Sequence, residues 1–91
     1  MRVGSLVSLK VTLLGNEPGT FGVCYEEYDY LGDGGCSFIF TNGTYDGFSK
    51  EEQKKFLTHI RDTDLDYHFT NVMRLSEDFD HGMFDEHLHR S

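Results

Sequence analysis

The 91-residue sequence lacks tryptophan, has a single proline and two cysteines, and contains no long apolar run. A membrane-spanning helix needs roughly 18 or more consecutive apolar residues, so no such helix is expected. The opening MRVGSLVSLK has one arginine but neither a continuous apolar segment nor a cleavage site, so a signal peptide is not expected either. We therefore expect a single-domain cytoplasmic protein, in which the acceptor motif Asn42-Gly43-Thr44 is not glycosylated.

Basic residues are also scarce. Eight Lys and Arg stand against sixteen Asp and Glu, which gives a formal net charge of −8. A negative field repels phosphate backbones and so disfavours direct nucleic-acid binding. The same field attracts basic surfaces, and a basic protein or peptide is therefore the partner that the composition favours.

Cys24 and Cys36 lie far apart in the sequence and form no C-x-x-C motif. A reducing compartment argues against a structural disulfide, and both residues are predicted to be small apolar strand residues. The acidic residues after Cys24 would raise the pKa of its thiol and so suppress its reactivity. Because G-x-S-x-G, H-E-x-x-H and P-loop motifs are missing too, we expect no enzyme activity and no cofactor.

Three strands are predicted in the first half of the chain, at residues 6–14, 20–28 and 36–40. In the first strand, apolar residues recur at every second position, which is typical of a half-buried strand; these residues are Val7, Leu9, Val11 and Leu13. Residues 29–35, DYLGDGG, are predicted to form a mobile loop because three of them are glycines.

Asn42-Gly43 predicts a two-residue type I′ turn, because both positions of that turn require positive φ. This turn would place Phe40 opposite Tyr45 in a fourth strand. The same stretch loosely matches the start of a calcium-binding loop, but its last ligand position is the uncharged Gln53 and no helix precedes it. We therefore expect a hairpin and not a calcium site.

Ser49 and Glu52 have the spacing of a capping box and predict a helix over residues 49–60. Its apolar stripe, which consists of Phe56, Leu57 and Ile60, is expected in the core. Alternation over residues 67–75 predicts a final strand. Residues 76–91 form a polar, acidic tail that belongs to the same domain or is partly disordered, with room for a short helix.

The stretch Val3–Phe48 resembles the SH3-like barrels of bacterial proteins, including the KOW type, through Gly4-Ser5-Leu6-Val7 and Gly19-Thr20-Phe21-Gly22-Val23. The resemblance implies a mainly β (α+β) fold, namely a small SH3-like antiparallel barrel over residues 1–75 that includes the capped helix. KOW-type domains often contact RNA or ribosome-bound proteins, usually through basic residues beside the turn. Here the turn is flanked by the acidic residues Glu17 and Glu26.

Tyrosines interleaved with carboxylates mark the candidate binding site, since aromatic rings supply rigid contact area and acids select a basic ligand. The residues of this site are Tyr25, Glu26, Glu27, Tyr28, Asp29, Tyr30, Asp33 and Tyr45. We predict a non-enzymatic interaction module that binds a basic protein or peptide, either as a monomer or as a homodimer.

Two alternative functions remain open. A KOW-like nucleic-acid-associated module would use a local basic patch made of Lys10, Lys54, Lys55 and Arg61. A metal-binding protein would use histidines and carboxylates of the C-terminal segment, which suit zinc or similar ions; these are His81, Asp85, His87 and His89.

Overall fold

The computed structural model describes residues 1–30, 32–63 and 72–82, and this part of the chain forms five strands and two helices. The elements are β1 (Ser5–Leu9), β2 (Phe21–Tyr30), β3 (Asp33–Phe40), β4 (Tyr45–Ser49), α1 (Lys50–Phe56), β5 (Leu57–Asp62) and α2 (Val72–Asp80). All five strands belong to one antiparallel sheet with the order β4-β3-β2-β1-β5. The prediction of a mainly β fold with antiparallel strands is therefore confirmed.

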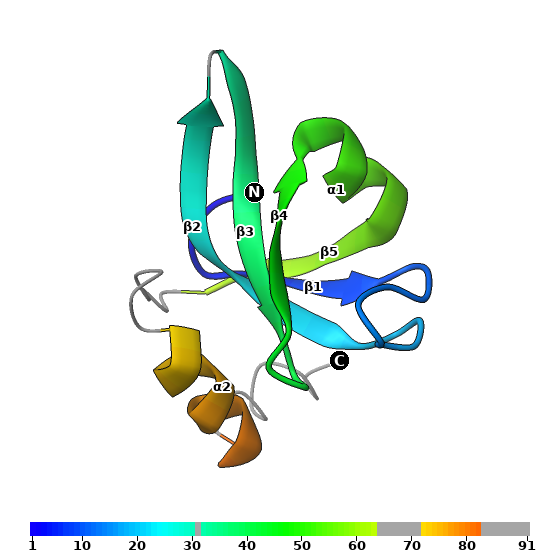
Figure 1. Cartoon of the computed structure of the whole chain (residues 1–91), viewed down its shortest axis with the longest axis vertical. Coiled ribbons are helices and arrows are strands. Elements are labelled where there is room, and N and C mark those ends of the chain that lie inside the picture. The colour runs from blue at the N-terminus through cyan, green and yellow to red at the C-terminus, as the bar shows by residue number, and fades with distance from the viewer. Residues whose placement is uncertain (31, 64–71, 83–91) are drawn as a thin grey trace.

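The sheet is open, because no pairing joins its edge strands β4 and β5 within the described residues. The barrel closure that the sequence predicted is not found. Figure 1 shows β2, β3 and β4 standing side by side while β1 and β5 cross them. An irregularity in β2 between Cys24 and Glu26 shifts the register with β3, and such bulges bend a strand and increase its twist.

One face of the sheet holds a cluster to which all five strands contribute, and we call it the inner cluster. It consists of Val7, Leu9, Cys24, Cys36, Phe38, Phe40, Phe48 and Leu57. The ring of Phe48 packs edge-on against Phe38 and Phe40, with centroid separations of 5.7 and 6.1 Å. Edge-to-face pairs at this distance add to the stabilisation that burial of the rings supplies.

The other face carries a smaller cluster, the outer cluster, which α2 covers. It consists of Leu6, Val23, Tyr25 and Ile39 from the sheet and Leu75 and Phe79 from α2. The spacing of four residues places Leu75 and Phe79 on one side of the helix. Figure 1 shows α2 set against the sheet at the end away from α1.

The predicted half-buried strand over residues 6–14 is wrong in two respects. Leu6 and Val7 are both fully buried, because both faces of β1 are covered, and the strand ends at Leu9. Val11, predicted to be in the core, is 37% exposed.

The predicted mobile loop over residues 29–35 is largely strand. Pairing of β2 with β3 continues until Tyr30 lies opposite Asp33. Gly34 and Gly35 therefore lie within β3, where a missing side chain lets neighbouring groups approach the backbone closely.

The sheet folds back after Phe40 as predicted, but through a different turn. The amide of Gly43 donates to Phe40 O at 2.8 Å and the amide of Phe40 donates to Thr44 O at 2.8 Å, which closes a three-residue loop. Only Gly43 has positive φ, so the two-residue type I′ turn is wrong. The extra loop residue shifts the register by one and pairs Tyr45 with Ile39 instead of Phe40.

The capping box is confirmed: the Glu52 amide donates to Ser49 Oγ at 3.2 Å, and Glu52 Oε1 accepts from the Ser49 amide at 2.9 Å. The helix is shorter than predicted, because α1 ends at Phe56 and the chain continues as β5. Leu57 is buried as expected, whereas Ile60 lies on the edge strand and is 38% exposed.

The predicted strand over residues 67–75 is wrong for the residues from Val72 onward, which are helical. Residues 67–71 lie outside the described part of the chain. The domain boundary proposed after residue 75 falls inside α2, whose Leu75 and Phe79 share the outer cluster. Neither described helix has the length and apolar character needed to cross a membrane.

Candidate functional site

Three of the predicted tyrosines lie on the face of the sheet that carries the outer cluster. We call this surface the tyrosine face and define it by Tyr25, Glu26, Tyr28 and Tyr45. The rings of Tyr25 and Tyr45 meet edge-on, with centroids 6.5 Å apart. Tyr25 is buried at the rim of the outer cluster, whereas Tyr45 on the edge strand β4 is 56% exposed.

Glycines on β3 and β4 make room for the third ring. A Cβ atom on Gly35 would overlap the Tyr28 hydroxyl, and one on Gly47 would lie 3.3 Å from the same ring. Tyr28 from β2 therefore lies across the backbones of two neighbouring strands. Gly35 was predicted to lie in a loop, so its contact with Tyr28 was missed. Gly47 was predicted in the fourth strand opposite Phe38, whereas the ring beside it is that of Tyr28.

Carboxylates surround the tyrosine face. Glu26 Oε1 accepts a hydrogen bond from Ser37 Oγ at 3.3 Å, which holds it beside Tyr25. Burial raises the pKa of Tyr25, and the charges of Glu26 and Asp46 raise it further. Burial is also the main cause of the raised pKa of Tyr28. Both phenols therefore stay protonated and can donate hydrogen bonds at neutral pH.

The remaining predicted residues of this site are distributed differently. Glu27 alternates to the other side of β2, where it lines a cleft of about 170 Å³ with Cys36 and Lys50. Asp29 is exposed on β2. The backbones of Tyr30 and Asp33 pair with each other at the tip of the hairpin, while their side chains lie outside the described part of the structure.

A second surface feature is a groove between α1, β5 and the end of β1, with a volume of about 610 Å³. We call it the basic groove. It is lined by Met1, Lys10, Lys50, Gln53, Lys54, Leu57, Thr58 and His59. Lys10 Nζ donates a hydrogen bond to Lys54 O at 2.8 Å, which joins the two segments.

The predicted basic patch is only partly assembled at this groove. Lys10 and Lys54 line it, whereas Lys55 and Arg61 are not among the lining residues. Lys50 was absent from the predicted patch, although its spacing of four from Lys54 places both on one helix face.

The two cysteines are buried and free, as small strand residues should be. Both belong to the inner cluster, and each thiol interacts with the other. The Cys24 thiol donates to Glu26 O at 3.3 Å, and the Cys36 thiol donates to Met1 O at 3.5 Å. The proximity of the two thiols raises the pKa of Cys24 and lowers that of Cys36. The neighbouring acids, which the sequence analysis held responsible for a raised pKa at Cys24, contribute less than the Cys36 contact and burial.

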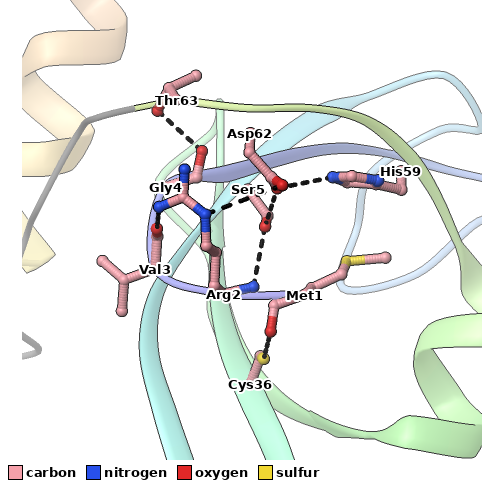
Figure 2. Close-up of polar contacts among 9 residues, drawn as sticks. All are labelled: Met1, Arg2, Val3, Gly4, Ser5, Cys36, His59, Asp62 and Thr63. Carbon is pink, nitrogen blue, oxygen red and sulfur yellow. Dashed lines mark hydrogen bonds and ion pairs between the residues drawn. The ribbon is translucent and has the colours of Figure 1, made fainter.

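A serine, a histidine and an aspartate meet where the N-terminal segment joins β5 (Figure 2), and we call this group the N-terminal clasp. Ser5 Oγ donates to Asp62 Oδ1 at 2.6 Å, and His59 Nε2 lies 2.9 Å from the same oxygen. The aspartate thus stands between the serine and the histidine. In a Ser-His-Asp triad the histidine must contact the serine as its base, so this arrangement does not have that order.

The clasp is better explained as a set of contacts that tie the N-terminal segment to the end of β5. The Arg2 guanidinium lies 3.8 Å from Asp62 Oδ2, and the amide of Arg2 donates to Ser5 Oγ at 2.9 Å. Thr63 Oγ1 donates to Gly4 O at 2.8 Å. The Ser5 hydrogen bond, followed by the contact with His59, lowers the pKa of the Asp62 carboxyl.

Of the predicted metal ligands, His81 is exposed just after α2, and Asp85, His87 and His89 lie outside the described residues. Within residues 1–30, 32–63 and 72–82, no three His, Cys, Asp or Glu side chains are grouped so that they could hold a metal ion.

Comparison with protein-family models, with curated proteins and with solved structures finds no match for the chain. Its function is therefore inferred from its own residues and their geometry.

Proposed function

We propose that the chain is a non-enzymatic interaction module that binds a basic protein or peptide through the tyrosine face. The proposal rests on one observation. Tyr25, Tyr28 and Tyr45 lie beside Glu26 on a part of the sheet where glycines leave room for the Tyr28 ring. Two strands, β2 and β4, supply these residues and β3 lies between them, so only the folded sheet presents them together.

The chemistry of this surface suits a cationic side chain. An Arg or Lys placed over a tyrosine ring gains cation–π attraction of roughly 0.5–1 kcal/mol at an exposed site. Glu26 and Asp46 supply negative charge beside the rings. A net charge of −8 accelerates the approach of a basic partner from longer range.

An SH3-like assignment of the fold is the second part of the proposal. It is supported by the strand order β4-β3-β2-β1-β5 and by the short helix between β4 and β5. It is also supported by the bulge in β2, the strand that pairs with both β1 and β3. The resemblance over residues 3–48 agrees with this assignment. SH3-like domains bind partners on exposed aromatic surfaces, which fits the tyrosine face.

The test is a titration of the full chain with short peptides rich in Lys and Arg, followed by fluorescence anisotropy at low and at high ionic strength. We expect binding that weakens with salt and that Tyr45→Ala weakens at least about five-fold, equivalent to ~1 kcal/mol. Glu26→Gln should weaken it as well, because the amide keeps the hydrogen bond from Ser37 but loses the charge.

Two matched control variants distinguish binding at the tyrosine face from effects of lost surface area or charge elsewhere on the chain. Ile60→Ala shortens another partly exposed side chain on the opposite edge strand, and Glu51→Gln removes a carboxylate of α1. Both variants should bind as the unmodified chain does. Binding that is lost equally in the controls, or that ignores Tyr45→Ala and Glu26→Gln, would remove the proposed surface.

A further inference from the structure

We infer that the basic groove is a second binding site, one that takes an acidic peptide segment with an apolar side chain. The groove gathers the ammonium groups of Lys10, Lys50 and Lys54 with the imidazole of His59, and none of its lining residues in the described part of the chain is a carboxylate. Three of the eight Lys and Arg of a chain with net charge −8 thus border one groove. This separation of charge favours a ligand opposite in sign to the partner of the tyrosine face.

The fold brings the three cations to one groove. Lys50 and Lys54 lie one helical turn apart on α1, so their side chains project from the same side of the helix. The hydrogen bond from Lys10 Nζ to Lys54 O holds the third ammonium group against α1. Groups that are already positioned lose less conformational entropy when a ligand arrives.

The floor of the groove is apolar, which distinguishes it from a simple patch of charges. Leu57 and the side chain of Met1 line it, together with the aliphatic stems of the lysines. An apolar side chain of the ligand can therefore be buried while carboxylates on either side of it meet the ammonium groups. A volume of about 610 Å³ accommodates such a segment.

The position of β5 suits an extended peptide. β5 forms an edge of the described sheet, and its residues Thr58 and His59 border the groove. An extended segment can lie along an exposed strand edge and form main-chain hydrogen bonds there.

A nucleic acid fits these observations less well than a peptide does. A long polyanion meets the negative field of the whole molecule, whereas a short acidic segment meets mainly the local cations. Lys55 and Arg61, which would extend a phosphate track, do not line the groove.

The experiment uses the full chain and a short fluorescein-labelled peptide in which glutamates flank a central phenylalanine, at low ionic strength. We expect saturable binding that falls about five-fold in the double variant Lys50→Gln/Lys54→Gln. Lys55→Gln is the matched control, because it removes a neighbouring charge of the same helix turn that does not line the groove. A peptide with glutamine in place of every glutamate should not bind, and one with serine in place of phenylalanine should bind more weakly.

Other outcomes overturn the inference. If Lys55→Gln and the double variant lose equal affinity for the acidic peptide, the peptide is attracted by overall charge and does not bind in the groove. Tighter binding of a single-stranded RNA or DNA oligonucleotide, abolished by the double variant, would assign the groove to a nucleic acid. Self-association in sedimentation that the double variant abolishes would assign it to a second copy of the chain. Because Tyr45→Ala should leave acidic-peptide binding unchanged, failure here is distinguishable from failure of the tyrosine face.

Discussion

The two faces of the sheet bury their apolar side chains by different means. The inner cluster draws residues from every strand, and Leu13 and Phe56 pack against it. The outer cluster depends on two side chains of α2, and that helix covers only part of its face. The tyrosine face lies on this same face of the sheet, beside the side chains of α2. On this face Tyr25 belongs to the outer cluster while its neighbour Tyr45 stays 56% exposed, so the tyrosine face borders the part of the sheet that α2 covers.

The largest expected effect concerns the stability of the inner face. Phe38→Ala removes a fully buried ring that packs against Phe48, and it should lower the free energy of unfolding by about 3–5 kcal/mol. Leu75→Ala, at a fully buried position of the outer cluster, should cost about 2–3 kcal/mol, near the low end for such a change. Urea unfolding measures both values.

Hydrogen exchange sharpens this contrast. In Leu75→Ala, amide protection should fall in α2 while β2 and β3 keep theirs, because the inner cluster does not need the helix. A uniform loss of protection in both regions would show that the two faces form one cooperative unit.

A smaller effect is expected at the glycines beneath Tyr28. Gly35→Ala places a methyl group against the Tyr28 hydroxyl and 2.6 Å from Phe48 O, so the backbone must shift at a cost of about 1–3 kcal/mol. Gly34→Ala is the matched control, since its Cβ would lie 3.6 Å from its nearest neighbours. It should change stability by less than about 1 kcal/mol. Similar effects in the two variants would contradict the placement of the tyrosine ring.

The smallest effect concerns the pH dependence that the N-terminal clasp contributes. The Ser5 hydroxyl and then His59 lower the folded-state pKa of Asp62 below its unfolded value of about 3.9. The contribution is therefore fully present above that value and is lost as the pH falls through the lower folded-state pKa. The stability gap between the unmodified chain and Asp62→Asn should accordingly shrink below about pH 4.

Asp80→Asn, which alters an exposed carboxylate of α2 outside the clasp, serves as the control for this pH series. Its stability should run parallel to that of the unmodified chain. If the stability difference between the unmodified chain and Asp62→Asn stays constant down to the acid transition, Asp62 does not form the stabilising hydrogen bonds described here.

Local signals in the sequence predicted local structure well. Alternation identified β2, the turn residues after Phe40 marked the reversal, and the Ser49–Glu52 spacing identified the start of α1. Each of these features depends on interactions between residues that are close in the chain. The residues that cause the turn or the helix start are therefore visible in a short stretch of sequence.

The errors came from interactions between distant segments. Alternation of apolar and polar residues predicts a strand with one face exposed to solvent. Leu6 and Val7 are nevertheless both buried, because α2 covers the face of β1 that would otherwise be exposed. One extra loop residue before Thr44 moved every partner of β4 by one position. Leu57 fits a helical stripe as well as a strand, and pairing with Leu9 decided for the strand.

The candidate site was predictable in composition but not in arrangement. The tyrosines and acids could be named from the sequence, and the structure brings Tyr25, Glu26, Tyr28 and Tyr45 together. It does not bring Glu27 to that surface, because alternation along β2 sends it to the other side. The basic groove required three elements to meet, which no single stretch of sequence displays.

Both proposals together require that two separate surfaces of this domain bind partners of opposite charge. Chemical-shift mapping on the ¹⁵N-labelled chain, with a basic peptide in one titration and an acidic peptide in another, is the decisive experiment. The basic peptide should shift the amides of Tyr25, Glu26, Tyr28 and Tyr45, and the acidic peptide those of Lys50, Lys54 and Thr58. Shifts from both peptides on the same residues, or shifts spread evenly over the chain, would contradict the claim.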